Sequence, residues 1–220
     1  MSGRTWLAAW AACWTVVVMS PPSDEVLLAR QSALQEEARG VLAGLDLAAV
    51  VAGAGPLLVT GSFVSRLMCW PEVDVMVHVG SGFSPRDAMG LLARIVSRPG
   101  VTGLDYRDER GTRCVTGQVR DERYHVLLIA EHAGRCWQID LTLWLHDPHV
   151  NVTRWHEELR ERITAEERMA VLRLKDDCTG GRPTRIRSAC VQIYTAVLDD
   201  GVRTPDQFAA WLAQQGLAVT

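Results

Sequence analysis

The sequence predicts an α/β (α+β) protein with a mixed α/β core between a helical lead and a helical tail. Three observations predict this class. Helix signals precede residue 53, apolar strand-like runs dominate residues 57–145, and the chain after Pro148 is charged and helical. With 220 residues, of which 48% are hydrophobic, the chain is long enough for one α/β domain with a helical appendage.

The first 22 residues are an apolar extension. Arg4 precedes an apolar stretch over residues 5–19, and Pro21-Pro22 separates it from the rest. A basic residue before a short apolar stretch resembles a secretory signal, and the stretch is too short for a comfortable membrane span. An extension from an upstream start codon and an extra helix packed on the domain are the alternatives.

The helical lead begins at Ser23, which is a predicted N-cap with acidic residues in the turn that follows. We expect this helix to reach about Arg39, because Gly40 and Gly44 interrupt the helical pattern. A short second helix is expected to follow, up to Ala52. Strands are predicted over 57–60, 73–79, 101–107, 113–120, 125–130 and 136–145, with helices over 62–69 and 85–97.

The tail is predicted to contain helices over 151–175, 186–200 and 205–215. Thr164 is expected to cap a second helix within the first of these ranges. The chain therefore divides into an extension (1–22), a core (23–150) and a C-terminal helical segment (151–220).

Carboxylates occur inside two of the predicted strands. Side chains alternate between the faces of a strand, so Glu72 and Asp74 share one face while Val73 and Val75 point into the core. Neighbouring carboxylates repel each other unless a cation lies between them, and Mg²⁺ prefers oxygen ligands. Asp140, in a third apolar strand, completes a cluster if that strand is adjacent, and such clusters hold two metal ions about 3.5–4 Å apart. The alternative is that Glu72 is an ordinary residue at the start of a strand after Pro71, and that Asp74 and Asp140 are buried acids paired with Arg residues.

A Gly-Ser pair lies between the first strand and the helix that follows it. Gly61 lets the backbone approach a phosphate, and the hydroxyl of Ser62 can donate a hydrogen bond to it. The strand, Gly-Ser, helix, strand order places this predicted phosphate site beside the carboxylates.

The combined pattern resembles the polymerase-β-type nucleotidyltransferase superfamily, which includes aminoglycoside, lincosamide and minimal nucleotidyltransferases. The resemblance covers residues 57–79, with Gly-Ser, a nine-residue spacer and Glu-Val-Asp, and residues 139–143 around the distant strand aspartate. It implies a mixed β-sheet core, Gly61 and Ser62 on a triphosphate, and Glu72, Asp74 and Asp140 on two Mg²⁺ ions. The first acid is Glu where many members have Asp.

The implied activity is transfer of an NMP from an NTP, with ATP as first choice, to a hydroxyl of a small-molecule acceptor with release of pyrophosphate. Asp74 and Asp140 would be catalytic, and Asp140 could act as metal ligand or general base. Modification of a partner protein by AMP, as in minimal nucleotidyltransferases of toxin–antitoxin type, and a non-catalytic nucleotide-binding module are the alternatives.

Two basic residues are further candidates for nucleotide binding. Lys175, the only lysine among 23 basic residues, lies near the end of a tail helix, where relatives place a cation that reaches the triphosphate. Arg66 follows the Gly-Ser pair on the short helix. The alternative for Lys175 is a cation at the C-terminal end of its helix that balances the helix dipole. His78, His146, His149 and three tryptophans, Trp70, Trp137 and Trp144, are weaker candidates for contacts with nucleotide or acceptor.

The net charge and the cysteine spacing exclude several classes of partner. A formal net charge of −3 gives no basic face for a nucleic acid, so neither a nucleic-acid primer nor a membrane is expected as a partner. The six cysteines show no zinc-binding spacing. A cytoplasmic location is expected because the implied chemistry uses nucleotide and magnesium, and the apolar extension leaves a secreted or anchored form as the alternative.

Overall fold

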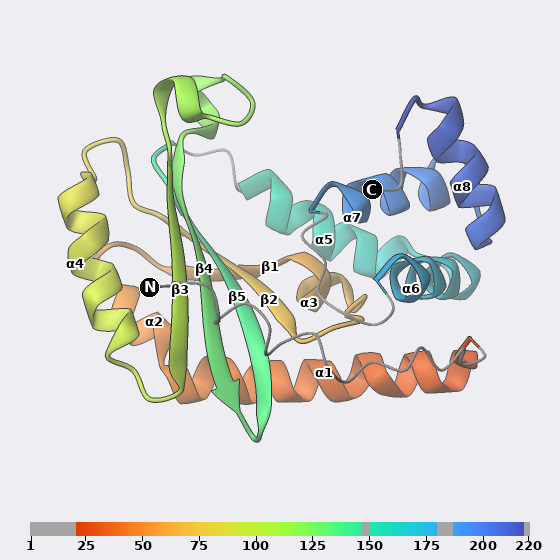
Figure 1. The fold of residues 1–220 in the computed structure, drawn as a ribbon, viewed down its shortest axis with the longest axis horizontal. Helices are drawn as coiled ribbons and strands as arrows, with labels where there is room; N and C mark the ends of the chain where they lie inside the picture. The colour runs from red at the N-terminus through yellow and green to blue at the C-terminus, as the bar shows by residue number, and fades with distance from the viewer. Residues whose placement is uncertain (1–20, 147–149, 180–186, 218–220) are drawn as a thin grey trace, which may run out of the picture.

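The computed structural model describes residues 21–146, 150–179 and 187–217, which form one mixed β-sheet and two groups of helices (Figure 1). The strands are β1 (Leu57–Thr60), β2 (Glu72–His78), β3 (Val101–Glu109), β4 (Arg123–His132) and β5 (Arg135–Trp144). Helices α1 (Asp24–Leu45), α2 (Leu47–Val51) and α4 (Pro85–Val96) pack on the sheet, and α3 (Gly61–Ser65) follows β1. The C-terminal helices are α5 (Val150–Arg162), α6 (Ala165–Thr179), α7 (Arg187–Leu198) and α8 (Pro205–Gln214). The predicted fold class is confirmed, and residues 1–20 of the apolar extension lie outside the described residues.

Helix α1 begins where the sequence predicts. The Ser23 hydroxyl accepts a hydrogen bond from the Val26 N–H at 3.4 Å. The predicted end near Arg39 is wrong, because the helix continues through Gly40 to Leu45. A Cβ at Gly40 would lie 2.8 Å from Nε2 of His132, so this glycine provides a close approach between helix and sheet and does not end the helix.

The sheet has the order β1-β2-β5-β4-β3. Strands β2 and β5 are parallel, and every other neighbouring pair is antiparallel. Alternate residues of each strand face α1, α2 and α4 and form the sheet core. Examples are Val73 and Val75 on β2, and Ile139 and Leu141 on β5. The other face of β2 and β5 therefore carries the side chains between them, including the three carboxylates.

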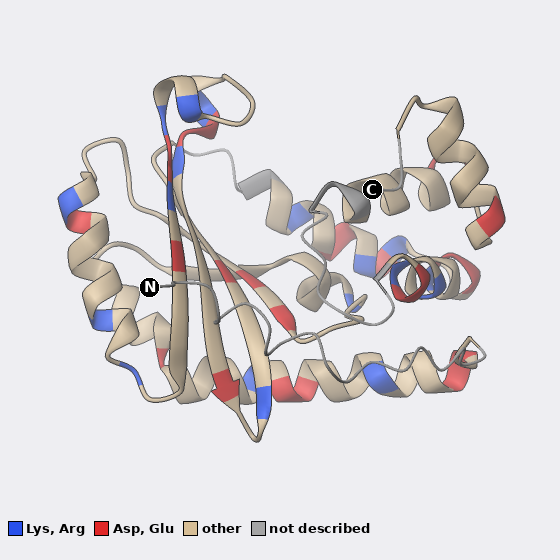
Figure 2. Ribbon diagram, in the orientation of Figure 1, with Lys and Arg blue, Asp and Glu red and all other residues tan. Residues whose placement is uncertain are grey.

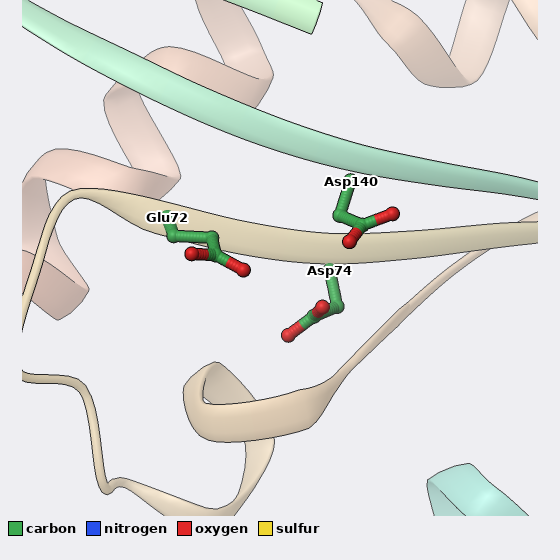
Figure 3. Close-up of side chains that lie close together, drawn as sticks. All are labelled: Glu72, Asp74 and Asp140. Atoms are coloured by element: carbon green, nitrogen blue, oxygen red, sulfur yellow. The ribbon is translucent and has the colours of Figure 1, made fainter. Parts of the chain in front are cut away.

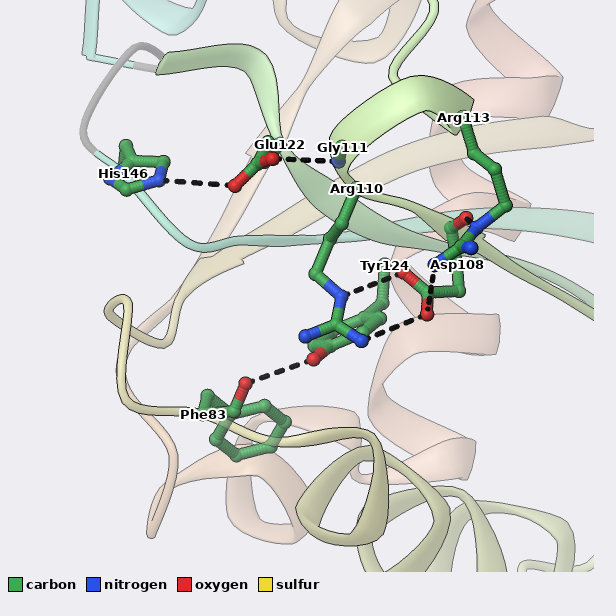
Figure 4. Close-up of polar contacts among 8 residues, drawn as sticks. All are labelled: Phe83, Asp108, Arg110, Gly111, Arg113, Glu122, Tyr124 and His146. Atoms are coloured by element: carbon green, nitrogen blue, oxygen red, sulfur yellow. Dashed lines mark hydrogen bonds and ion pairs between the residues drawn. The ribbon is translucent and has the colours of Figure 1, made fainter. Parts of the chain in front are cut away.

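The predicted strand over 113–120 is wrong. The connection between β3 and β4 instead contains two 3₁₀ turns, Gly111–Arg113 and Val119–Asp121. Arg110 donates to both carboxylate oxygens of Asp108, at 2.7 and 2.9 Å, and Arg113 donates to the same carboxylate at 2.8 Å (Figure 4). These local bonds satisfy polar groups without a neighbouring strand, and the Arg110 bond lowers the pKa of Asp108.

The same connection is attached to the rest of the sheet (Figure 4). The Arg110 guanidinium lies 4.9 Å from the centre of the Tyr124 ring, and the Tyr124 hydroxyl donates to the Phe83 carbonyl at 3.0 Å. Glu122 accepts from the Gly111 N–H at 2.7 Å and lies 3.6 Å from Nε2 of His146. His146, a weak candidate for substrate contact, therefore has a structural partner at the end of β5.

A second apolar core lies among α5–α8. It includes Leu159, Leu172 and Ile193, and it is joined by Leu67 and Trp70 from the segment between α3 and β2. Each fully buried apolar side chain of this size contributes about 1.5–3 kcal/mol of burial free energy. The segment that leads into the carboxylate strand is therefore fixed by the C-terminal helices.

Helix α1 belongs to both cores. Leu27 packs in the C-terminal core, and Leu34 packs in the sheet core. Arg173 on α6 donates to Asp24 at 2.9 Å, and an ion pair joins Arg30 to Asp176. The predicted three-part division of the chain stays a prediction.

Candidate functional site

Three carboxylates from two adjacent strands meet on the sheet face that is turned away from the sheet core (Figure 3). Asp74 on β2 pairs in register with Asp140 on β5, and Glu72 lies one pleat away from Asp74 on the same face. Each residue offers an oxygen, and the three oxygens lie within 4.8 Å of one another. The cluster could therefore hold a metal ion.

The environment of the cluster suits a hard divalent cation. Glu72 and Asp74 are half-buried, and Asp140 is only 9% exposed. Carboxylates confined this closely repel each other, and partial burial weakens the screening by water. The donor set consists of oxygens, which fits Mg²⁺, Ca²⁺ or Mn²⁺ better than a softer metal.

Gly61 lies directly against the cluster. Its predecessor Thr60 pairs in register with Asp74, and the Gly61 backbone has a left-handed φ of +67°. A Cβ built on Gly61 would lie 1.9 Å from Oδ2 of Asp74, so any other residue here would have to displace this carboxylate. The predicted adjacency of the Gly-Ser pair and the carboxylates is therefore present in the fold.

Ser62 is held by a lysine from the C-terminal helices. The Lys175 ammonium donates to Oγ of Ser62 at 3.1 Å, to the Leu67 carbonyl at 3.0 Å and to the Tyr194 hydroxyl at 2.9 Å. Lys175 is 0% exposed and lies outside the last turn of α6, so it is not the helix-end cation of the alternative interpretation. Its side chain ties α6 and α7 to the start of α3.

Two aromatic rings lie close to the ammonium of Lys175. Its Nζ lies 5.4 Å from the Trp70 ring centre and 5.0 Å from the Tyr194 ring centre. Burial by itself lowers the pKa of Lys175, but the Tyr194 hydroxyl and the thiols of Cys190 and Cys69 outweigh burial, and the pKa is raised. Burial raises the pKa of Tyr194. The raised pKa of Lys175 favours its charged form.

Two buried N–H donors that the sequence did not single out for this role contact the carboxylates. Nε1 of Trp70 donates to Oε2 of Glu72 at 2.7 Å. His125 on β4 is 2% exposed, and its Nε2 is hydrogen-bonded to Oδ1 of Asp140. The signal for His125 was its place in an apolar strand, but strand order was needed to connect it with Asp140.

The remaining candidates lie elsewhere. Arg66 is exposed at the C-cap of α3 with φ 58°, and its carbonyl accepts from Arg168 at 2.8 Å. His78 is exposed at the end of β2. The Arg123 guanidinium lies over the Trp144 ring, with its Cζ atom 5.0 Å from the centre of that ring. The role of Arg66 in nucleotide binding stays a prediction.

Trp137 is fully buried within the sheet core, which rules out stacking on a base or sugar in this structure. His149 lies outside the described residues.

Two open surface hollows lie away from the cluster. One, of about 430 Å³, is lined by residues of α8 and the α7–α8 connection, including Trp211, and the other, of about 630 Å³, lies between α2 and α4 beside Arg98. Neither hollow includes any of the three carboxylates, Gly61 or Ser62.

Comparison of the chain with protein-family models and with curated proteins finds no match. Within residues 21–146, 150–179 and 187–217, no helix combines the length and the apolar character that crossing a membrane requires.

Proposed function

We propose that the chain is a metal-dependent nucleotidyltransferase of the polymerase-β type. It would transfer an NMP, with ATP as the first-choice donor, to a hydroxyl of a small-molecule acceptor. The supporting observation is the contact between Gly61 and Asp74, which joins a Gly-Ser turn to three clustered carboxylates in one site. Phosphoryl and nucleotidyl transfer require a phosphate site next to a metal site, and this contact supplies that adjacency.

Glu72, Asp74 and Asp140 would hold Mg²⁺. When bound, Mg²⁺ neutralises charge on the phosphates and increases the acidity of the acceptor hydroxyl. The all-oxygen donor set and the limited space favour this ion or Mn²⁺ as its substitute in experiments.

Ser62 would orient the triphosphate. An ammonium has no acceptor atom, so Oγ of Ser62 accepts the bond from Lys175. The Ser62 side chain is also hydrogen-bonded to Tyr194, and a phosphate oxygen would take over the hydrogen of the Ser62 hydroxyl when the triphosphate binds. The charge of Lys175 lies directly behind that hydroxyl and favours an anion in front of it. Gly61 adds no side chain that would keep a phosphate at a distance.

The acceptor oxygen attacks the α-phosphorus, the bond between the α-phosphorus and the bridging oxygen breaks, and pyrophosphate leaves. The proton of the acceptor hydroxyl passes to Asp140 if this residue is the general base, or to solvent if it is only a metal ligand. Binding the hydroxyl beside Asp140 provides the required orientation in both cases.

A small acceptor fits the charge distribution better than a nucleic acid. Lys and Arg are dispersed over α1, α4, the β3–β4 connection and the C-terminal helices in the view of Figure 2. The chain carries a formal net charge of −3. A primer strand would be repelled, because nucleic-acid binding depends on clustered cations. A cytoplasmic location, where ATP and Mg²⁺ are available, belongs to the same proposal.

The test is to incubate the protein with each of the four NTPs, Mg²⁺ and a panel of hydroxylated small molecules, and to search for a mass gain of one NMP by mass spectrometry. Asp140→Asn is the matched control for contaminating activity, because it keeps the shape of the side chain. A product formed by the wild type and absent with Asp140→Asn supports the proposal. Unchanged NTP with every acceptor, together with no effect of Mg²⁺ and NTP on thermal unfolding, contradicts it.

A further inference from the structure

His125 is a buried polar residue that the proposed reaction does not yet use. It lies on β4, where it pairs with Thr142 of β5, while the next residue on its face, Leu127, pairs with Asp140. His125 and Asp140 are therefore diagonal neighbours on the same face of an antiparallel pair, a spacing that long side chains bridge. Their side chains do so through Nε2 and Oδ1.

The direction of this hydrogen bond follows from its partners. An ionised carboxylate can only accept, so Nε2 of His125 carries the hydrogen whether or not the other ring nitrogen is protonated. Both side chains are nearly excluded from solvent, with exposed fractions of 2% for His125 and 9% for Asp140. Water cannot easily replace this donor, so the bond restricts the rotation of the Asp140 carboxylate.

The other two carboxylates are restricted by different means. Nε1 of Trp70 donates to Glu72, and the absence of a side chain at Gly61 lets Asp74 lie against the backbone. Donors behind metal-binding side chains set their orientation, and their loss commonly weakens metal binding 10–100-fold. His125 occupies this place behind Asp140.

We propose that His125 is a positioning residue that orients Asp140 for a divalent cation. The inference rests on the proposed function, in which Asp140 is a metal ligand. His125 acts by orienting the Asp140 carboxylate and does not itself contact nucleotide or acceptor. The property that depends on His125 is the affinity for the cation.

A purely structural role would have different consequences. If His125 were only a structural residue, any disruptive substitution would lower the free energy of unfolding. The size of the effect would not depend on how far an N–H donor of the new side chain reaches. The amide nitrogen of Gln extends about as far as Nε2 of His, whereas that of Asn is one bond shorter. Both amides are polar and both fit within the volume of the imidazole.

The experiment compares His125→Gln with His125→Asn, and adds His125→Leu as a variant without a donor. Mn²⁺ binding is measured by electron paramagnetic resonance, with and without saturating ATP, and unfolding is followed in EDTA. Thr142→Val is the matched control, because it changes the strand partner of His125 while leaving the His125–Asp140 bond in place.

We expect His125→Asn and His125→Leu to bind Mn²⁺ about 10–100-fold more weakly than the wild type, and His125→Gln to recover most of the affinity. Thr142→Val should bind Mn²⁺ as the wild type does. If His125→Leu does not fold, the comparison between Gln and Asn decides. Equal Mn²⁺ affinities for Gln, Asn and wild type would overturn the inference and leave the proposed function intact. A wild type that neither binds Mn²⁺ nor transfers an NMP would overturn both.

Discussion

Gly61 lies so close to Asp74 that any side chain at position 61 would displace the Asp74 carboxylate. A Cβ there would lie 1.9 Å from Oδ2 and 2.7 Å from Cγ of Asp74. The Gly61 backbone also has a φ of +67°, which side chains of L-residues rarely adopt. Backbone and carboxylate therefore constrain each other at the point where the phosphate and metal parts of the candidate site meet.

Gly61→Ala should displace the Asp74 carboxylate and remove metal binding. The left-handed backbone alone costs about 1–2 kcal/mol of stability, and moving Asp74 adds to this cost. Mn²⁺ titration and urea unfolding measure the two effects. Gly201→Ala is the matched control, because Gly201 has a φ of +69° and open space around its Cβ position. Loss of stability in both variants with unchanged Mn²⁺ affinity in Gly61→Ala would contradict the prediction.

Asp74→Asn should abolish NMP transfer and leave the fold intact. The substitution keeps the shape of the side chain and removes one charge from the cluster, so repulsion falls and stability without metal should be unchanged or rise slightly, by up to about 1 kcal/mol. Circular dichroism and thermal unfolding with and without Mg²⁺ measure this. An unfolded Asp74→Asn protein, with a wild type that does not respond to Mg²⁺, would indicate that Asp74 is a structural ion-pair member.

Lys175→Met should weaken NTP binding or slow transfer by about 1–3 kcal/mol, the range of a hydrogen bond to a charged group. Methionine fills most of the buried space of Lys175 but cannot donate to Ser62. Isothermal titration with ATP and a parallel unfolding curve separate nucleotide affinity from stability. Tyr194→Phe is the control, since it removes a hydroxyl next to Lys175 and keeps the ammonium. Wild-type affinity and rate in folded Lys175→Met would restrict Lys175 to a structural role.

His156 should make the protein less stable in mild acid. Burial, assisted by the nearby charge of Lys175, lowers the pKa of His156 to about 4. The unfolded chain binds this proton below about pH 6.5, so the stability contributed by the neutral imidazole is complete above that pH and is lost as the pH falls toward 4. The loss should be of the order of 2 kcal/mol, allowing for the partial exposure of the ring.

His156→Phe keeps an aromatic ring next to Trp155, whose ring centre lies 4.8 Å from that of His156, and removes the titration. The difference in unfolding free energy between wild type and His156→Phe should therefore change between pH 6.5 and 4. Guanidine unfolding at several pH values measures it. Parallel pH profiles for the two proteins would show that His156 does not titrate at a lowered pKa.

Local patterns in the sequence were sufficient for the features that depend on neighbouring residues. The alternation of side chains along a strand placed Glu72 and Asp74 on one face, and the caps at Ser23 and Thr164 marked helix starts that the structure contains. The same local rules failed for the strand expected over 113–120, because bonds such as Arg110–Asp108 stabilise turns there.

The sequence by itself therefore determined the fold class, the strands that carry the carboxylates and the Gly-Ser turn beside them. Only the tertiary structure decided that β2 and β5 are parallel neighbours with Asp74 opposite Asp140, that Lys175 is buried behind Ser62 and that His125 reaches Asp140. Strand periodicity and helix capping are set within a few residues of chain. Strand order and buried contacts depend on packing between residues far apart in sequence, so they cannot be read from a short stretch of chain.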